Sequence, residues 1–169
     1  IGVDGDQSEH NSFVTNPHNP TFYVNNFANA ERQLFGIFSE ATIAATDIIT
    51  VDLGLRYNRA TTDSDKVNSS MAMMMPAVVV LRNRFNNADL KQEDDLIDAV
   101  AKISAQIEED VTLYAGVARK SRAPSYQERY LWLPMQATAG LADGNNHVGN
   151  VELKPEISHE IELGVDWKG

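Results

Sequence analysis

Apolar and polar residues alternate with a period of two along several stretches of the chain, the pattern of a β-strand with one apolar and one polar face. The alternation is cleanest over residues 49–59, where the apolar face carries Val51, Leu53, Leu55 and Tyr57. The other stretches are residues 33–45, 95–107, 111–119 and 156–167, and residues 1–9 are a weaker candidate. The pattern therefore predicts an all-β fold of about six strands.

Residues 95–107 also fit a helix, because Leu96, Val100, Ile103 and Ile107 recur at helical spacing. The Ala, Lys, Gln and Glu residues in this part of the chain favour a helix too. On its own evidence the segment fits either structure. Residues 49–57 and 111–117, however, have the β-branched and aromatic content of strands, and they favour a strand at 95–107 as well.

The connections between these stretches alternate in length. Residues 46–48 and 108–110 are tight turns, whereas residues 11–30, 61–94 and 121–155 are long connections. In an antiparallel meander alternate connections lie at the same end of the sheet, so all the long loops are expected on one side. A soluble sandwich has no reason to separate them in this way, but outer-membrane barrels have short periplasmic turns and long outer loops. The sequence therefore predicts an antiparallel meander that is part of a larger transmembrane β-barrel.

Two aromatic residues agree with this prediction. Tyr57 lies in the apolar register near the long-loop end of its strand, and Trp167 lies in the apolar register at the opposite end. Aromatic girdles occupy both interfaces of membrane barrels. The alternative is that each residue lies at the rim of a soluble sheet.

Composition narrows the range of functions. The 169 residues carry a formal net charge of −10, so a nucleic-acid partner is not expected. The absence of cysteine excludes disulfides, thiolate metal sites and cysteine nucleophiles. No apolar run reaches the ~18 to 20 residues of a transmembrane helix. The sequence contains no catalytic constellation, and we do not expect an enzyme.

Two motifs near the end of the chain resemble those of TonB-dependent outer-membrane receptors. The segments are "ARKSRAPSYQERY" (residues 118–130) and "GNVELKPEISHEIELGVDW" (residues 149–167). In that family a strand ends in Arg-Ala-Pro, a variable outer loop follows, and an Asn-x-x-Leu-Lys-Pro-Glu segment leads into a strand that ends Glu-Leu-Gly. The matching residues are Arg122, Ala123, Pro124, Asn150, Leu153, Lys154, Pro155, Glu156, Glu162, Leu163 and Gly164. The resemblance covers residues 111–168, and residues 31–60 by general pattern.

The resemblance implies a location in the outer membrane of a Gram-negative bacterium, with contacts to its lipid and lipopolysaccharide. It also implies import of a metal ion or a metal chelate, copper or siderophore-like, with energy from the TonB complex. Such receptors close about 22 strands around a plug, so we expect residues 1–169 to be a partial barrel domain without the plug. Residues 130–155 look most like the branch of copper receptors.

Methionines in the connection 61–94 are candidate metal ligands: Met71, Met73, Met74 and Met75. Thioethers are soft ligands suited to Cu(I), so copper is a possible ligand, although no resident cofactor is expected. In the next long connection, Met135 and His147 share one loop and are further candidate metal ligands. The alternative is that flexible methionines fill an apolar patch beneath the loop. The histidines are far apart and form no His-x-x-x-His pair.

The basic residues Arg119, Lys120 and Arg122 have two possible roles. They could meet lipopolysaccharide phosphates or pair with carboxylates in the lumen such as Glu128 and Glu162. Pairing is favoured, because charges at membrane depth normally find partners.

Two further architectures remain open from the sequence. One is a complete small barrel of eight strands with a structural or adhesive role, a size that about 170 residues would fit. The other is a soluble α+β domain with a helix at 95–107.

Overall fold

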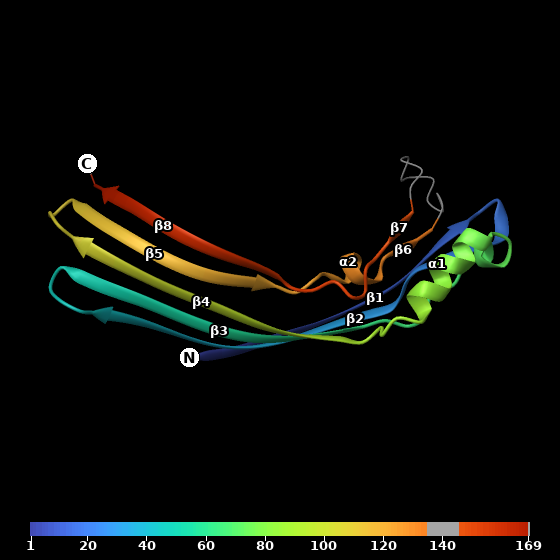
Figure 1. The fold of residues 1–169 in the computed structure, drawn as a ribbon, viewed down its shortest axis with the longest axis horizontal. Coiled ribbons are helices and arrows are strands. Elements are labelled where there is room, and N and C mark those ends of the chain that lie inside the picture. Colours follow the sequence, from blue (N-terminus) through green and yellow to red (C-terminus); the bar gives the residue numbers. More distant parts are fainter. Residues whose placement is uncertain (135–145, 169) are drawn as a thin grey trace.

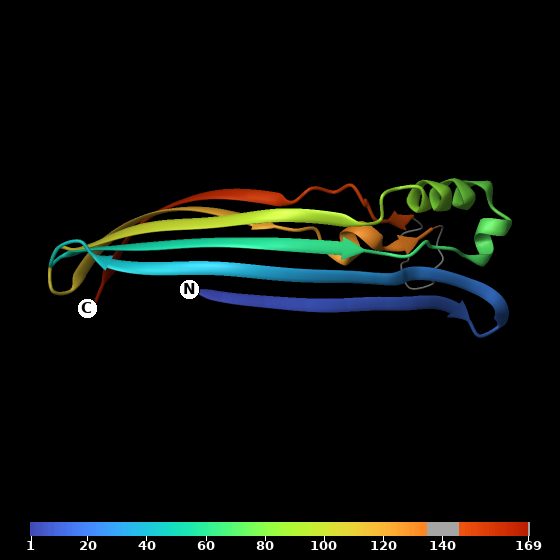
Figure 2. The same cartoon turned by 90° about the horizontal axis from the view of Figure 1, so that it is seen from below.

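The computed structural model describes residues 1–134 and 146–168. Six strands form one sheet in the order β1-β2-β3-β4-β5-β8, with antiparallel pairing throughout. They are β1 (Gly2–Asn16), β2 (Asn19–Ala44), β3 (Ile49–Asp63), β4 (Gln92–Gln106), β5 (Val111–Arg122) and β8 (Glu156–Trp167). The sheet is long and curved (Figures 1 and 2). The predicted fold class is confirmed: the sheet is a curled part of a barrel.

The β2–β3 and β4–β5 turns lie at one end of this sheet, and the two long connections lie at the other end together with the tight β1–β2 turn (Figure 1). Short turns join β2 to β3 and β4 to β5. At the other end, the connection from β3 to β4 contains the 3₁₀-helix η1 (Ser70–Met73) and the helix α1 (Pro76–Asn86). The connection from β5 to β8 contains α2 (Tyr126–Tyr130) and the strands β6 (Trp132–Leu133) and β7 (His147–Val148). Within the described residues, no helix has the length and apolar character needed to cross a bilayer.

The long loop predicted at residues 11–30 is wrong. Strands β1 and β2 continue through it, and only Pro17 and His18 lie between them. The register of the pair shifts between His10 and Ser12 and again next to Phe13. These irregularities shift side chains from one face to the other and remove the two-residue period from the sequence.

The helix considered at residues 95–107 is also wrong. Residues 92–106 form strand β4, which pairs with β3 along nearly its whole length and with β5 over its second half. A strand in this position has hydrogen-bonding partners on both sides. The two neighbouring strands therefore override the helical preference of its Ala, Lys and Gln residues.

One face of the sheet carries an apolar band. Cross-strand pairing places Leu53 beside Ala41 and Ala101, and Val117 beside Ala101 and Ile161. We call this surface the apolar band; its larger members are Val3, Phe35, Ile37, Ile43, Val51, Leu53, Leu55, Ile97, Ile103, Leu113, Val117, Ile157, Ile161, Leu163, Val165 and Trp167. Leu55 is 59% exposed and Ile161 is 82% exposed. A contiguous apolar surface of this extent needs a partner other than water.

The ends of the apolar band carry aromatic side chains with polar tips. The Tyr57 hydroxyl lies 2.6 Å from Asp95 Oδ1 at the loop end. At the turn end, the Trp167 indole N–H donates to Asp110 Oδ2 over 2.9 Å. Each ring combines an apolar body with a hydrogen-bonded tip, which suits a membrane interface.

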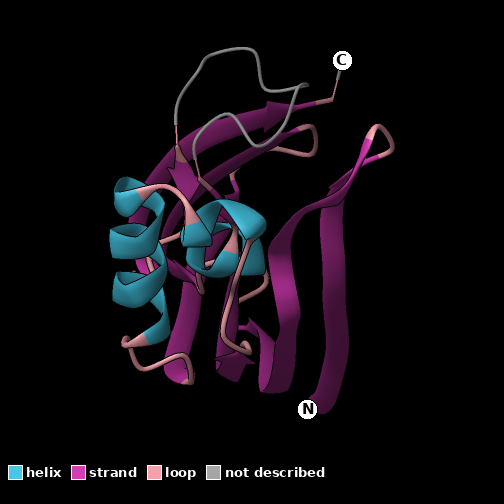
Figure 3. Ribbon diagram, turned by 90° about the vertical axis from the view of Figure 1, so that its right-hand side faces the viewer, coloured by secondary structure: helices cyan, strands magenta, loops and turns pink. Residues whose placement is uncertain are grey.

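The loops form a core of their own at the outer end of the sheet. We call residues 64–91, 123–134 and 146–155 the outer cap; Figure 3 looks onto this end of the sheet and shows the helices of the cap in cyan in front of the strands. The side chains that it buries against β2 include Val67, Val78, Phe85, Tyr130, Trp132 and Val151. Asn58, Ala60 and Thr62 of β3 are buried at the loop end of the polar face, and the Tyr130 hydroxyl of the cap contacts Thr62. The cap therefore packs like a small soluble domain.

Candidate functional site

The Arg-Ala-Pro motif forms the junction between the sheet and the outer cap. Arg122 is the last residue of β5, and Ala123 and Pro124 are buried directly after it. Proline has no amide hydrogen, so it ends the pairing of β5 with β8. Ser125 then begins α2 as its N-cap, and Glu128 completes a capping box with it. The motif thus directs the chain from strand β5 of the sheet into the outer cap.

Arg122 also joins the two family motifs. Its guanidinium contacts Glu128 of α2 over 2.9 Å and Glu156 of β8 over 3.0 Å. Glu156 ends the Leu-Lys-Pro-Glu segment and lies directly opposite Arg122 in the β5–β8 register. The hydrogen bonds from Arg122, followed by those from the backbone and side chain of Ser125, lower the pKa of Glu128 to about 2. Its two carboxylate partners raise the pKa of Arg122.

The expected pairing of the basic residues is confirmed for Glu128 and wrong for Glu162. Lys120 contacts Glu160 over 3.2 Å, and Arg119 donates to the carbonyl of Ile97. The register explains the difference, because Glu162 lies opposite Gly116, farther toward the turn end than Lys120.

A buried arginine links α2 to strands β3 and β4 of the sheet. Arg129 is 0% exposed, and its Nη1 lies 2.7 Å from Asp94 Oδ2 of β4. The same guanidinium donates to Thr62 Oγ1 over 2.9 Å and to the Leu153 carbonyl over 2.8 Å. One side chain therefore connects α2, two wall strands and the segment before β8.

Tyr130 extends this buried network. Its hydroxyl lies 2.8 Å from Thr62 Oγ1 and donates to the Leu90 carbonyl over 2.9 Å. Burial raises the pKa of Tyr130 to about 12. The phenol is neutral across the physiological range, so it acts as a fixed connection between the two loops.

Gly149 packs directly against the end of α2. A Cβ at this position would collide with the backbone of Arg129. The Gly149 amide donates to the Leu131 carbonyl over 2.6 Å, and the Asn150 amide donates to the Glu128 carbonyl over 2.8 Å. Only glycine permits this approach, which places residues 148–152 against α2.

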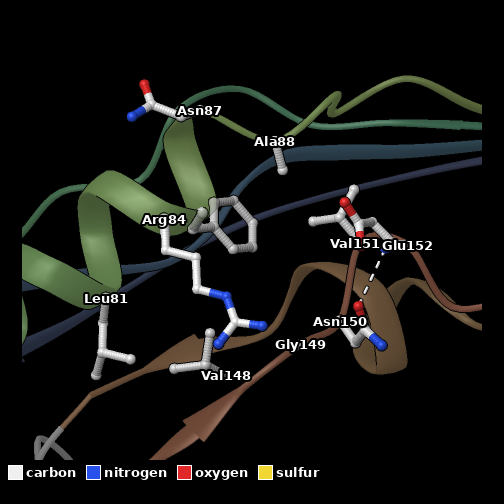
Figure 4. Close-up of a pocket in the computed structure, with 10 residues that line it drawn as sticks. Leu81, Arg84, Asn87, Ala88, Val148, Gly149, Asn150, Val151 and Glu152 are labelled. Atoms are coloured by element: carbon white, nitrogen blue, oxygen red, sulfur yellow. Dashed lines mark hydrogen bonds between the residues drawn. The ribbon is translucent and has the colours of Figure 1, made fainter.

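A cavity of about 500 Å³ opens between the second half of α1 and residues 148–152 (Figure 4). Its lining is Leu81, Arg84, Phe85, Asn87 and Ala88 from the α1 side, and Val148, Gly149, Asn150, Val151 and Glu152 from the other side. The sequence indicates neither the cavity nor the Arg129 network, because both combine residues that lie far apart in the chain. Asp94 falls just outside the strand predicted at 95–107, so the alternation of apolar and polar residues carries no signal for it.

The candidate methionines separate into two pairs. Met71 and Met75 pack against the core of the outer cap, whereas Met73 and Met74 are 74% and 75% exposed. Met135 lies outside the described residues. His147 lies in β7, opposite Leu133. Among residues 1–134 and 146–168, no three His, Asp or Glu side chains converge as a metal site.

Comparison with known proteins identifies the family. The family described as "TonB dependent receptor-like, beta-barrel" matches residues 1–169. The chain belongs to this family. The resemblance carried by Arg122–Pro124 and Leu153–Glu156 is therefore confirmed. TonB-dependent receptor barrels lie in the outer membrane of Gram-negative bacteria, and the family consists of receptors and transporters rather than enzymes.

A solved structure shares this fold. The structure titled "Copper transporter OprC" has a TM-score of 0.67 and 20% sequence identity to the chain. The alignment covers 99% of this chain and 25% of that chain. At this identity the likeness shows the fold, and the chain spans about a quarter of the length of that structure. No curated protein matches the chain.

Proposed function

We propose that the chain forms wall strands and outer loops of an outer-membrane receptor that imports a metal ion or a metal chelate. In this proposal the TonB complex supplies the energy and copper is the first candidate cargo. The observation that carries the proposal is the division of one curved sheet into two surfaces. Its outward face is the apolar band, and the loop end of its polar face lies beneath the outer cap.

The exposed apolar band supports contact with outer-membrane lipid. Charged residues replace the apolar side chains at its loop end, where Arg59 lies opposite Asp95 and Arg119 lies opposite His159. We place the outer membrane interface here, with Arg59 and Arg119 near lipopolysaccharide phosphates. A change from apolar to charged side chains within one register is typical of the end of a membrane span.

Two observations support copper as the cargo. Met73 and Met74 are exposed thioethers on the outer cap, and such soft ligands suit Cu(I). The structural neighbour is named a copper transporter. Met71 and Met75 pack against the cap core and fit the alternative role of filling an apolar patch. Met135 and His147 remain further candidate ligands from the other loop.

Copper uptake by cells that make the full-length receptor tests the proposal. We expect uptake to stop when TonB is deleted. The double variant Met73→Leu/Met74→Leu should reduce uptake at limiting copper by about tenfold, the effect of losing a ligand contact worth about 1.4 kcal/mol. Met71→Leu/Met75→Leu is the matched control and should retain uptake, because leucine replaces methionine in cores at little cost.

Two results would contradict the proposal. Uptake that is independent of TonB for copper and for iron chelates alike would exclude energy-coupled metal import. Equal copper uptake by both double variants would exclude Met73 and Met74 as ligands while leaving import itself intact.

The structure favours a receptor over the two alternatives. Strands β1 and β8 are the two edges of the described sheet and do not pair with each other, so these six strands do not close a small barrel. Residues 92–106 are a strand, so the soluble domain with a helix at 95–107 is excluded.

A further inference from the structure

Among the described residues, the lining of the cavity in the outer cap includes no methionine, and it does not include Arg129, Tyr130, Asp94 or Thr62. The apolar residues Leu81, Phe85, Val148 and Val151 are part of its lining. Four polar side chains, Arg84, Asn87, Asn150 and Glu152, are also part of its lining. A volume of about 500 Å³ lies within the range of small-molecule sites, which combine an apolar lining with a few polar groups.

The two charged groups of the cavity come from opposite walls. Arg84 extends from α1 towards Val148, and Glu152 lies across the cavity on the segment that follows β7 (Figure 4). Across residues 1–134 and 146–168, neither the Arg84 guanidinium nor the Glu152 carboxylate has an ion pair or a side-chain hydrogen bond. The Asn150 side-chain oxygen accepts from the Glu152 amide over 3.2 Å, which leaves its NH₂ group to donate.

We propose that this cavity binds a small zwitterionic molecule of amino-acid or dipeptide size with a free amino group, a free carboxylate and an apolar side chain. The carboxylate would pair with Arg84, whose planar guanidinium matches a carboxylate in a bidentate manner. The ammonium group would pair with Glu152. The side-chain amide of Asn150 would meet the peptide group, and Phe85 and Val151 would contact the apolar side chain.

The chemistry of the lining separates this ligand from others. An inorganic anion would leave Glu152 facing it, and a free metal ion would find a single carboxylate and an opposing guanidinium. Neither matches one cation and one anion on opposite walls. The site does not depend on the metal import proposed above, because no methionine or histidine of residues 1–134 and 146–168 lines it.

Calorimetry with the purified full-length receptor and the dipeptide leucyl-phenylalanine tests the proposal. The parent dipeptide should bind saturably. Its C-terminal amide and its N-acetyl form should each bind about tenfold or more weakly, because each loses one charge-assisted contact. Arg84→Gln should weaken the parent dipeptide but not the C-terminal amide. Glu152→Gln should weaken the parent but not the N-acetyl form.

Arg82→Gln is the matched control, since Arg82 lies on the same helix outside the cavity and contacts Asn68 and Asn83. It should bind all three ligands as the wild type does. Absence of saturable binding by the wild type would overturn the proposal. Equal binding of the three ligands, or equal loss in the Arg82 and Arg84 variants, would overturn it too.

Discussion

Apolar side chains are exposed in the turn half of the sheet, the half that ends in the β2–β3 and β4–β5 turns, and buried in the outer cap. Phe35 in the apolar band is 57% exposed, whereas Phe85 in the cap is 3% exposed. Trp167 at the turn end is 73% exposed, and Trp132 in β6 is fully buried. The same residue types therefore occupy opposite environments within one chain. We infer that the first region is built for a lipid solvent and the second for water.

This difference in exposure indicates which interactions stabilise each region. In the turn half, backbone hydrogen bonds between neighbouring strands are satisfied within the sheet, as a membrane wall requires. In the outer cap, regular pairing is replaced by a buried core and by charged groups such as Arg129 and Asp94. Substitutions in the two regions should therefore destabilise the folded protein through different mechanisms.

The largest effect is expected in the outer cap from Arg129→Met, which leaves Asp94 buried without its cation. Loss of one partner of a buried ion pair costs about 3 to 5 kcal/mol. Hydrogen exchange on the full-length receptor should show α2 and β6 losing protection while the turn half of β5 keeps it. Arg82→Met is the control, and Arg129→Met/Asp94→Leu should recover part of the loss. Unchanged protection of α2 would mean that the network does not anchor the cap.

A smaller effect is expected in the turn half from Leu53→Arg. Arginine on the lipid face of a barrel costs about 2 to 4 kcal/mol near the middle of the bilayer. Val100→Arg is the matched control, because Val100 pairs with Gly54 and its side chain is on the opposite face. Denaturant unfolding of the receptor in lipid vesicles should show a loss for Leu53→Arg alone. Equal losses in both variants would contradict the assignment of the apolar band to lipid.

The smallest effect is a pH dependence confined to the junction between the two regions. The pKa of Glu128 is lowered from 4.5 to about 2, so its contacts stabilise the folded cap fully above pH 4.5. As the pH falls from 4.5 towards 2, the unfolded chain binds a proton at Glu128 and the folded cap does not, so this contribution to stability decreases. Below about pH 2 both states are protonated and the contribution is lost. Hydrogen exchange in α2, corrected for its intrinsic pH dependence, should rise between pH 5 and pH 3. In Glu128→Gln the rise should disappear; persistence would assign it to another carboxylate.

The sequence predicted the turn half well for a physical reason. Strands such as β3 and β4 have strand neighbours on both sides and one apolar face, so their period of two is visible directly in the sequence. Where the ladder is irregular, as at His10 and Ser12 of β1, the period disappears, and the pattern predicts only residues 1–9 of a strand that continues to Asn16. Local pattern therefore identifies regular strands and fails at bulges.

The outer cap was predicted less completely, because its contacts are long-range. Arg129 and Asp94 are 35 positions apart, and nothing near either residue indicates the other. The pairing of Arg122 with Glu128 was foreseeable, since the two residues are separated by six positions around a capping box. The cavity required the packing of α1 against residues 148–152, which no periodicity encodes.

The length of β2 has a consequence for the proposed receptor. Its 26 residues, at ~3.3 Å each, extend over about 85 Å. A tilted strand needs only about 9 to 11 residues to traverse the hydrocarbon layer. If the apolar band spans the membrane as proposed, more than half of β2 lies outside the hydrocarbon layer, and an incoming solute would pass along this extension of the sheet before it reached the level of the lipids.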